Sequence, residues 1–209
     1  MPETRHMAHY LVNDTPETCD FSPETWGHVL DSLDRTLVIG RRVVTAVRFD
    51  GVDQPTFRSP ELAAADLSLV DRVDIDTEDA AALLAAAVDA AGESLPGLVS
   101  GVRATAASLR AGTPDAQAGL VALVAAVQSL VALTAAAATA ANVSMGAASG
   151  AAPPVEAACG GLETALRSLV THQATEQWPA LADALDADLA PAIARWHDVL
   201  EPIRERATA

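Results

Sequence analysis

The sequence predicts an α+β protein that is predominantly helical, with a small module of short strands around one helix followed by an all-α bundle. Strand-like runs and hairpin signals are confined to residues 1–77, whereas residues 78–209 show only helical spacing interrupted by Pro and Gly. The chain is 50% hydrophobic but only 3% aromatic, so Ala, Val and Leu supply the apolar surface, as in closely packed helices. We therefore expect two domains with these bounds.

The N-terminal module is expected to start with a strand and continue with an amphipathic helix. The run His9–Val12 has β-type residues and ends at an Asn-Asp pair suited to a turn. A Ser-Pro-Glu sequence at residues 22–24 has the N-cap residue and the proline of a helix start. Apolar residues then recur at helical spacing up to Gly40, at Trp26, Val29, Leu30, Leu33 and Leu37. This spacing predicts one amphipathic helix.

Beyond Gly40 the apolar period changes to that of a strand. A β-branched run reaches Phe49 and is followed by Asp50-Gly51, a strong hairpin signal, and by a weaker return strand that Pro55 interrupts. A Ser-Pro-Glu turn and an alternating strand around Ile75 complete the module. This order of elements resembles that of β-grasp (ubiquitin-like) modules. The resemblance implies a fold and no particular activity.

Residues 78–209 are expected to form a bundle of about five helices. The first is capped at residues 77–79, and Gly92 to Pro96 is expected to break or kink it. A small-residue connector at residues 142–154 separates later helices. In the last segment the apolar spacing continues across Pro191, which predicts two helices sharing one buried face or one kinked helix.

The stretch from Ala116 to Val155 carries no charged side chain, so it is a candidate membrane span by length. Gln128 near its middle would be costly in lipid, and Ala gains little from transfer into lipid. The flanks lack the Arg, Trp and Tyr residues typical of membrane interfaces. We therefore predict the central helix of a soluble bundle, covered on every side by neighbouring helices, and no membrane partner.

The charge of the chain argues against nucleic acid as a partner. The formal net charge is −15, and such a field repels phosphate backbones and anionic headgroups. Two widely separated cysteines, Cys19 and Cys159, form neither a disulfide framework nor a metal-binding pair. No apolar segment at the N-terminus resembles a secretion signal. These features predict a cytoplasmic protein.

No group of residues in the sequence predicts catalysis. Dinucleotide, Walker-type and nucleophile-elbow motifs are absent, so we expect no enzymatic activity and no cofactor. Asp183 and Asp186 are one helical turn apart, with Asp188 close by, and are weak candidates for binding a divalent cation or an Arg of a partner. A solvated acidic face is the ordinary interpretation of such a run. His172 and His197 are the histidines that could join such a site.

The function expected from these features is that of a non-enzymatic protein-interaction, scaffold or assembly-factor protein that self-associates through its helical region. An acidic helical chaperone for secretion or flagellar export is one alternative, and a metal-binding protein or enzyme using the Asp/His face is another. The candidate interaction surface is the apolar face of the last segment: Trp178, Leu181, Leu185, Leu189, Trp196 and Leu200.

Overall fold

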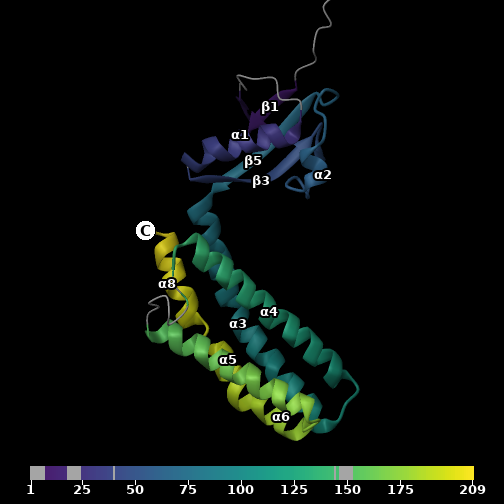
Figure 1. Cartoon of the computed structure of the whole chain (residues 1–209), viewed down its shortest axis with the longest axis vertical. Helices are drawn as coiled ribbons and strands as arrows, with labels where there is room; N and C mark the ends of the chain where they lie inside the picture. Colours follow the sequence, from purple (N-terminus) through teal and green to yellow (C-terminus); the bar gives the residue numbers. More distant parts are fainter. Residues whose placement is uncertain (1–7, 18–24, 40, 144, 146–152) are drawn as a thin grey trace, which may run out of the picture. The chain divides into compact units, whose positions relative to one another are not determined.

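The structure is a computed structural model that describes residues 8–17, 25–39, 41–143, 145 and 153–209. It is α+β and predominantly helical, as predicted, with strands in its first part and long helices after them (Figure 1). The chain divides into two compact units, Met1–Leu83 and Leu84–Ala209. The boundary predicted after Thr77 falls within the last strand, because that strand continues to Asp79 before a helix begins.

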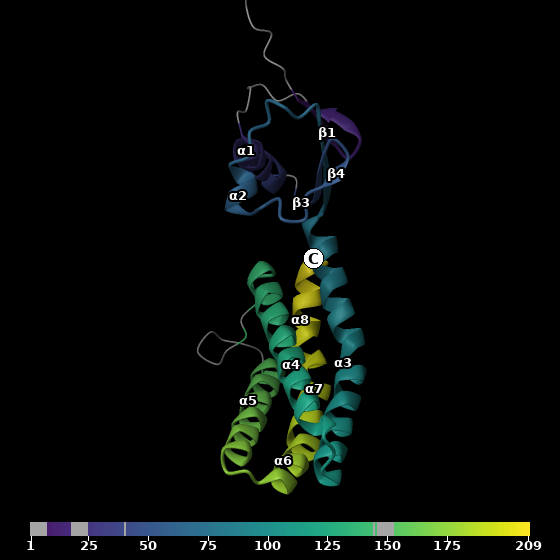
Figure 2. The ribbon, with the colours of Figure 1, turned by 90° about the vertical axis from the view of Figure 1, so that its right-hand side faces the viewer.

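The N-terminal unit contains a five-stranded mixed sheet with the order β2-β1-β5-β3-β4. Its strands are β1 (His9–Val12), β2 (Thr15–Glu17), β3 (Arg42–Phe49), β4 (Val52–Asp53) and β5 (Arg72–Asp79). Strands β1 and β5 are parallel, and the other neighbouring pairs are antiparallel. Helix α1 (Trp26–Ile39) covers one face of this sheet, and α2 (Pro60–Ala63) is a single turn before β5 (Figure 2). The β-grasp-like arrangement expected from the element order is therefore present.

Local signals in the sequence explain the turns of this unit. Asp50 and Gly51 have φ values of 49° and 81°, the left-handed pair that a tight hairpin between β3 and β4 requires. The Ser-Pro-Glu start predicted at residues 22–24 lies outside the described residues, as does the helix end predicted at Gly40.

The core of the N-terminal unit is closed around one large side chain. Trp26 is fully buried, its Nε1 donates a hydrogen bond to the Phe57 carbonyl at 2.7 Å, and its ring meets Phe49 edge-on. The other buried members are Tyr10, Val29, Leu30, Leu33, Val44, Val47, Leu67, Val73 and Ile75. The apolar faces of α1 and of the sheet thus cover each other.

The second unit is built from three long helices and an interrupted C-terminal segment. The long helices are α3 (Ala80–Ala111), whose first residues belong to the N-terminal unit, α4 (Asp115–Ala140) and α5 (Pro153–Ala174). The C-terminal segment comprises α6 (Trp178–Ala184), the π-helical turn η2 (Leu185–Leu189), α7 (Ala190–Ala194) and α8 (His197–Ala207). The segment is thus a kinked, interrupted helix, one of the two arrangements expected, and most of the predicted 142–154 connector lies outside the described residues.

Helix α3 is continuous through Gly92–Pro96, where the sequence predicted a break or a kink, so a break at this position is wrong. Its start is set by Asp79, whose Oδ1 accepts hydrogen bonds from the backbone N–H groups of Ala81 and Ala82, both at 2.9 Å. Pro96 removes one backbone hydrogen bond and costs about 3 kcal/mol. Burial on the same face continues on both sides of the proline, at Val88 and Val102, and offsets that cost.

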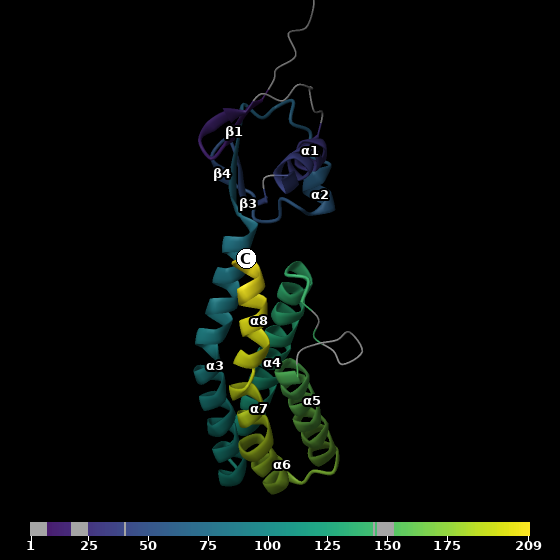
Figure 3. The same cartoon turned by 90° about the vertical axis from the view of Figure 1, so that its left-hand side faces the viewer.

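The apolar face of the C-terminal segment lies at the centre of the hydrophobic core of the helical unit, whereas its opposite face is exposed, for example at Asp188, Ala194 and Glu201. In Figures 2 and 3 α8 is seen between α3 and α4, and Figure 1 shows it at the edge of the unit. Leu185, Ile193 and Val199 are all 0% exposed. The sequence predicted that α4 is the central helix, covered on every side by its neighbours, which the structure corrects, because Val121 and Val124 of α4 are 67% and 52% exposed. An Ala-rich helix offers little side-chain volume, whereas the Leu, Ile and Trp side chains of the C-terminal segment fill the space between the long helices.

One buried hydrogen-bond chain joins α4 to this centre. The Trp196 Nε1 donates to Thr134 Oγ1 at 3.0 Å, and that hydroxyl donates to the Leu130 carbonyl at 2.7 Å. Because both side chains are buried, the pairing satisfies groups that water cannot reach. It also fixes the position of α4 along the C-terminal segment.

Two helices, α3 and α4, are long and apolar enough to cross a membrane by length and composition. The buried shares of their most apolar windows in this structure are 17% and 28%. Length and composition do not distinguish a membrane span from a helix of a soluble bundle. The absence of a membrane partner therefore stays a prediction.

Candidate functional site

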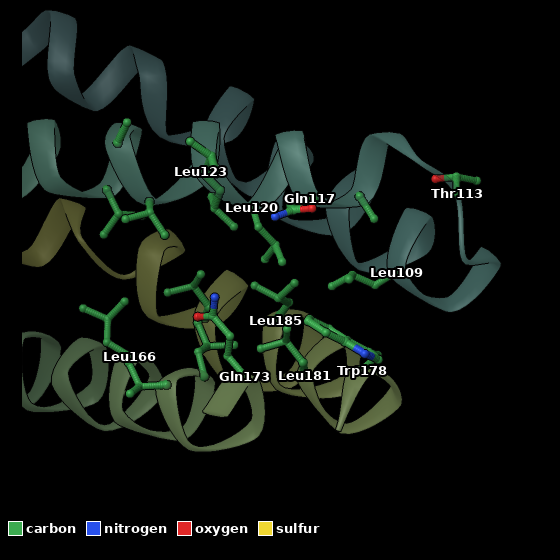
Figure 4. A pocket seen from close by; sticks show the side chains of 18 of the residues that line it. Leu109, Thr113, Gln117, Leu120, Leu123, Leu166, Gln173, Trp178, Leu181 and Leu185 are labelled. Atoms are coloured by element: carbon green, nitrogen blue, oxygen red, sulfur yellow. The ribbon is translucent and has the colours of Figure 1, made fainter. Parts of the chain in front are cut away.

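The helical unit has an open groove between α4 and α5, with α6 and η2 as its floor (Figure 4). We call it the α4–α5 groove, and its volume is about 1110 Å³. Most of its lining residues are aliphatic. The full lining consists of Leu109, Gly112, Thr113, Pro114, Ala116, Gln117, Leu120, Val121, Leu123, Val124, Ala125, Val127, Gln128, Leu166, Leu169, Val170, Gln173, Trp178, Leu181, Leu185 and Leu189.

Helical spacing explains why α4 and α5 form the walls. On α4, Leu123 and Val127 face the core, Val124 lies beside them around the helix, and Val121 lies one turn before Val124 on the outer face; Val124 and Val121 remain exposed. On α5, Val170 is 65% exposed, and Trp178 at the start of α6 is 44% exposed. The groove is therefore edged by apolar side chains that face solvent, although most large apolar side chains of this unit are buried.

The polar groups of the groove are uncharged. Gln117 and Gln128 come from α4, and Gln173 comes from α5; in Figure 4, Gln117 and Gln173 extend into the groove from opposite walls. Among the lining residues there is no Asp, Glu, His, Arg or Cys, and Thr113 supplies the one hydroxyl group. The lining offers apolar contact and a few amide groups that donate and accept hydrogen bonds.

The residues predicted as an interaction surface separate into three groups. Trp178 lies at the edge of the groove, and Leu181, Leu185 and Leu189 form its floor with exposures of 2% or less. Trp196 and Leu200 are buried in the bundle and do not line the groove. Five of the six predicted residues are therefore covered by helices of the same chain, because the face predicted as surface packs against α3, α4 and α5.

The acidic residues considered for cation binding contact an arginine of this chain. Arg110, in the last turn of α3, reaches Asp186 with Nη1 at 2.5 Å and Asp183 with Nη2 at 2.8 Å. The hydrogen bonds that Arg110 donates to Asp183 and then to Asp186 raise the pKa of its guanidinium above the usual value. Asp188 is exposed on η2. The acidic turn thus joins α6 and η2 to α3, and its two paired carboxylates already have a cationic partner.

The histidines do not converge with these carboxylates in the described part of the chain. His172 Nδ1 lies 3.3 Å from Gln177 Oε1, and His197 Nε2 lies 2.9 Å from Asp198 Oδ1. Within residues 8–17, 25–39, 41–143, 145 and 153–209, no three His, Cys, Asp or Glu side chains cluster as metal ligands would. Cys159 on α5 is half-buried, and burial raises the pKa of its thiol.

A π-helical turn lies beneath the groove. In η2 the backbone N–H of Ala190 bonds to the Leu185 carbonyl, five residues earlier, and Leu185 and Leu189 of this turn line the groove. Pro191 follows directly, and a proline in a helix disturbs the hydrogen bonds of the preceding turn. Single π turns recur at functional sites, which agrees with the groove being the site of interest.

Comparison with known proteins finds no matching family model, no similar curated protein and no similar solved structure. The site must therefore be interpreted from its own geometry.

The sequence did not lead us to predict that the walls of the groove are exposed, although the composition of α4 was compatible with it. Helix α4 is apolar on all sides, and a helix of this kind either is covered on all sides or leaves an apolar face open. The sequence favoured the first outcome, and the exposures of Val121 and Val124 show the second.

Proposed function

We propose that this is a non-enzymatic protein-interaction protein, of the scaffold or assembly-factor class, whose helical unit binds an apolar helix of a protein partner in the α4–α5 groove. The observation that carries the proposal is an uncharged apolar groove edged by exposed Val121, Val124, Val170 and Trp178. Contiguous exposed apolar surface of this kind marks interaction sites on soluble proteins. A helix laid along a hydrophobic groove is a common mode of recognition.

The size of the groove suits a helical occupant. A helix about 10 Å wide that rises 1.5 Å per residue fills roughly 120 Å³ per residue, so a groove of about 1110 Å³ matches roughly nine residues. Nine residues are about two and a half turns, which present three or four apolar side chains on one face. Each exposed Val or Trp side chain at the edge of the groove that such a face buries contributes on the order of 1 kcal/mol to the binding free energy.

The polar groups of the groove favour an uncharged occupant face. Gln117, Gln128 and Gln173 can exchange hydrogen bonds with Ser, Thr, Asn or Gln of a partner helix. A charged side chain placed against this lining would lose its hydration without gaining an opposite charge.

The proposal is tested with the variant Val124→Glu and its matched control Ala122→Glu. Both substitutions add a carboxylate to the same turn of α4, but Val124 lines the groove, whereas Ala122 is exposed and lies outside the lining. We expect wild-type protein and Ala122→Glu to retain from native lysate the same partner protein, and Val124→Glu to lose it. Equal retention by Val124→Glu would contradict a function of the groove.

Trp178 provides a direct measure of groove occupancy. Trp26 and Trp196 are 0% and 2% exposed, so quenching by acrylamide reports chiefly on Trp178. Adding the purified partner should shift the emission of Trp178 to shorter wavelength and reduce its quenching. The variant Trp178→Phe should show neither change.

An export chaperone would be a special case of the same binding mode, with an apolar segment of a secreted client in the groove. This alternative predicts that the protein retained from native lysate is a secreted one. The alternative of a metal-binding or enzymatic function through Asp183 and Asp186 has weaker support, because both carboxylates already pair with Arg110.

A further inference from the structure

The charge distribution of this chain restricts how two copies can meet. With a net charge of −15, copies repel each other wherever acidic surfaces face one another. Exposed carboxylates without an arginine partner among the described residues lie on the other helices of the helical unit, for example at Glu93 of α3, Glu156 of α5 and Glu205 of α8. Helix α4, in contrast, carries one charged residue, Asp115 in its first turn, and the groove beside it carries none. On this surface of the described part of the unit, two acidic copies can touch without opposing carboxylates.

The groove and its α4 wall are also complementary to each other. Val121, Val124 and Gln128 project from α4 as an exposed ridge of two helical turns, which is close to the length of helix that the groove can hold. Ala125 and Ala132 beside this ridge are exposed and small, so a second helix can approach the backbone closely. Because α4 carries both the ridge and one wall of the groove, a two-fold axis brings each ridge into the other groove.

The amide groups support the same pairing. An amide side chain both donates and accepts hydrogen bonds, so Gln128 of one copy can pair with an amide in the groove of the other, such as Gln173. A partner with a charged ridge would leave these amides facing an unpaired charge.

We infer that the occupant of the α4–α5 groove is helix α4 of a second copy of this chain, in a symmetric dimer. The inference rests on the proposed function of the groove and names the partner. Self-association then occurs through α4 and α5, and the buried face of the C-terminal segment takes part only as the groove floor.

The experiment measures mass by size-exclusion chromatography with light scattering, over a range of protein concentrations, at low and at high salt. We expect dimers for wild-type protein and for Ala122→Glu, and at least a tenfold weaker dimer for Val124→Glu. Because the interface is uncharged, high salt should leave the dimer intact or strengthen it, whereas a dimer held by ion pairs would dissociate. Far-UV circular dichroism confirms that each variant remains helical.

Quenching of Trp178 locates the interface. In the dimer, acrylamide should quench Trp178 less than in Val124→Glu, since the second α4 covers the groove. A dimer whose mass and quenching are unchanged by Val124→Glu overturns the inference, because its interface lies elsewhere.

A wild-type chain that is monomeric at all concentrations also overturns the inference. If that monomer still retains a different partner, and Val124→Glu loses it, the proposed function stands with another occupant. If neither variant changes any binding, the groove is not a binding site and both proposals fail.

Discussion

Helix α4 is almost entirely apolar but partly exposed, whereas the C-terminal segment carries several charges and buries its large apolar side chains. Helix α4 has 26 residues with one charge, yet Val121, Val124 and Leu133 are 67%, 52% and 40% exposed. The C-terminal segment carries Asp183, Asp186 and Asp188 among others, yet its Leu, Ile, Val and Trp side chains from Leu181 to Ile203 are 0–4% exposed.

The difference shows that the size and position of the side chains decide which helix presents a fully buried face to the core. Leu, Ile and Trp recur in the C-terminal segment every three or four residues and fill the space between three neighbours. Ala dominates α4, so covering its outer face would bury little area per residue. The acidic residues of the C-terminal segment lie where the helix reaches solvent or Arg110.

The largest expected effect breaks the centre of the unit. Ile193→Ala removes three carbons from a side chain that is 0% exposed, and we expect a loss of about 2–5 kcal/mol in the free energy of unfolding. The control Leu133→Ala removes three carbons from a side chain of α4 that is 40% exposed, and we expect about 1 kcal/mol. Urea denaturation followed by circular dichroism compares them. Equal losses would show that α4 is as central as the C-terminal segment.

The next effect tests the link between the two helices. Thr134→Val deletes the hydroxyl that accepts from Trp196 Nε1, which leaves a buried donor unsatisfied and costs about 1–3 kcal/mol. The matched control is Thr139→Val, since Thr139 makes the same bond to the carbonyl four residues earlier but is exposed. The same urea titration measures both variants. If the two lose equal stability, the buried bond contributes nothing to the packing of α4.

A smaller effect is expected at the exposed contact between α3 and the C-terminal segment. Arg110→Gln removes the cation that pairs with Asp183 and Asp186, so their mutual repulsion is no longer compensated. We expect a melting temperature below that of wild-type protein at low salt and a smaller difference in 1 M NaCl. Arg103→Gln is the control, because Arg103 is exposed and pairs with no carboxylate among the described residues. A salt-independent difference would indicate lost packing and not lost charge pairing.

The smallest effect concerns the contact of α5 with the centre. Burial raises the pKa of the Cys159 thiol, so less thiolate forms on the folded chain at a given pH. In a Cys19→Ser background, alkylation of Cys159 should be slower in the folded than in the unfolded protein between pH 8 and 9. Because the unfolded chain ionises first, folding stability should fall slightly as the pH rises above the ordinary thiol pKa. Equal alkylation rates would place Cys159 in open solvent.

Local signals allowed much of the N-terminal unit to be predicted. Asp50-Gly51 specifies a tight hairpin through two left-handed residues, and the apolar spacing from Trp26 to Leu37 specifies one face of a helix. The start of α3 is also local, because Asp79 caps the backbone of the two residues that follow the first helical one. Each of these features depends on residues within a few positions of one another.

The groove could not be predicted in this way. Its walls come from α4 and α5 and its floor from α6 and η2, and the sequence does not state how far apart two apolar helices lie. The pairing of Arg110 with Asp183 joins residues 73 positions apart, so the acidic turn looked free in the sequence.

The sequence by itself determined the order and type of the elements, since hydrophobic period, caps and turn residues act over short distances along the chain. It also determined that α4 carries no charge after Asp115 in its first turn. Only the tertiary structure decided that the C-terminal segment fills the centre and that α4 forms one wall of an open groove. The physical reason is that burial depends on how side-chain volumes from distant segments fill a common space, and two helices of similar apolarity compete for it.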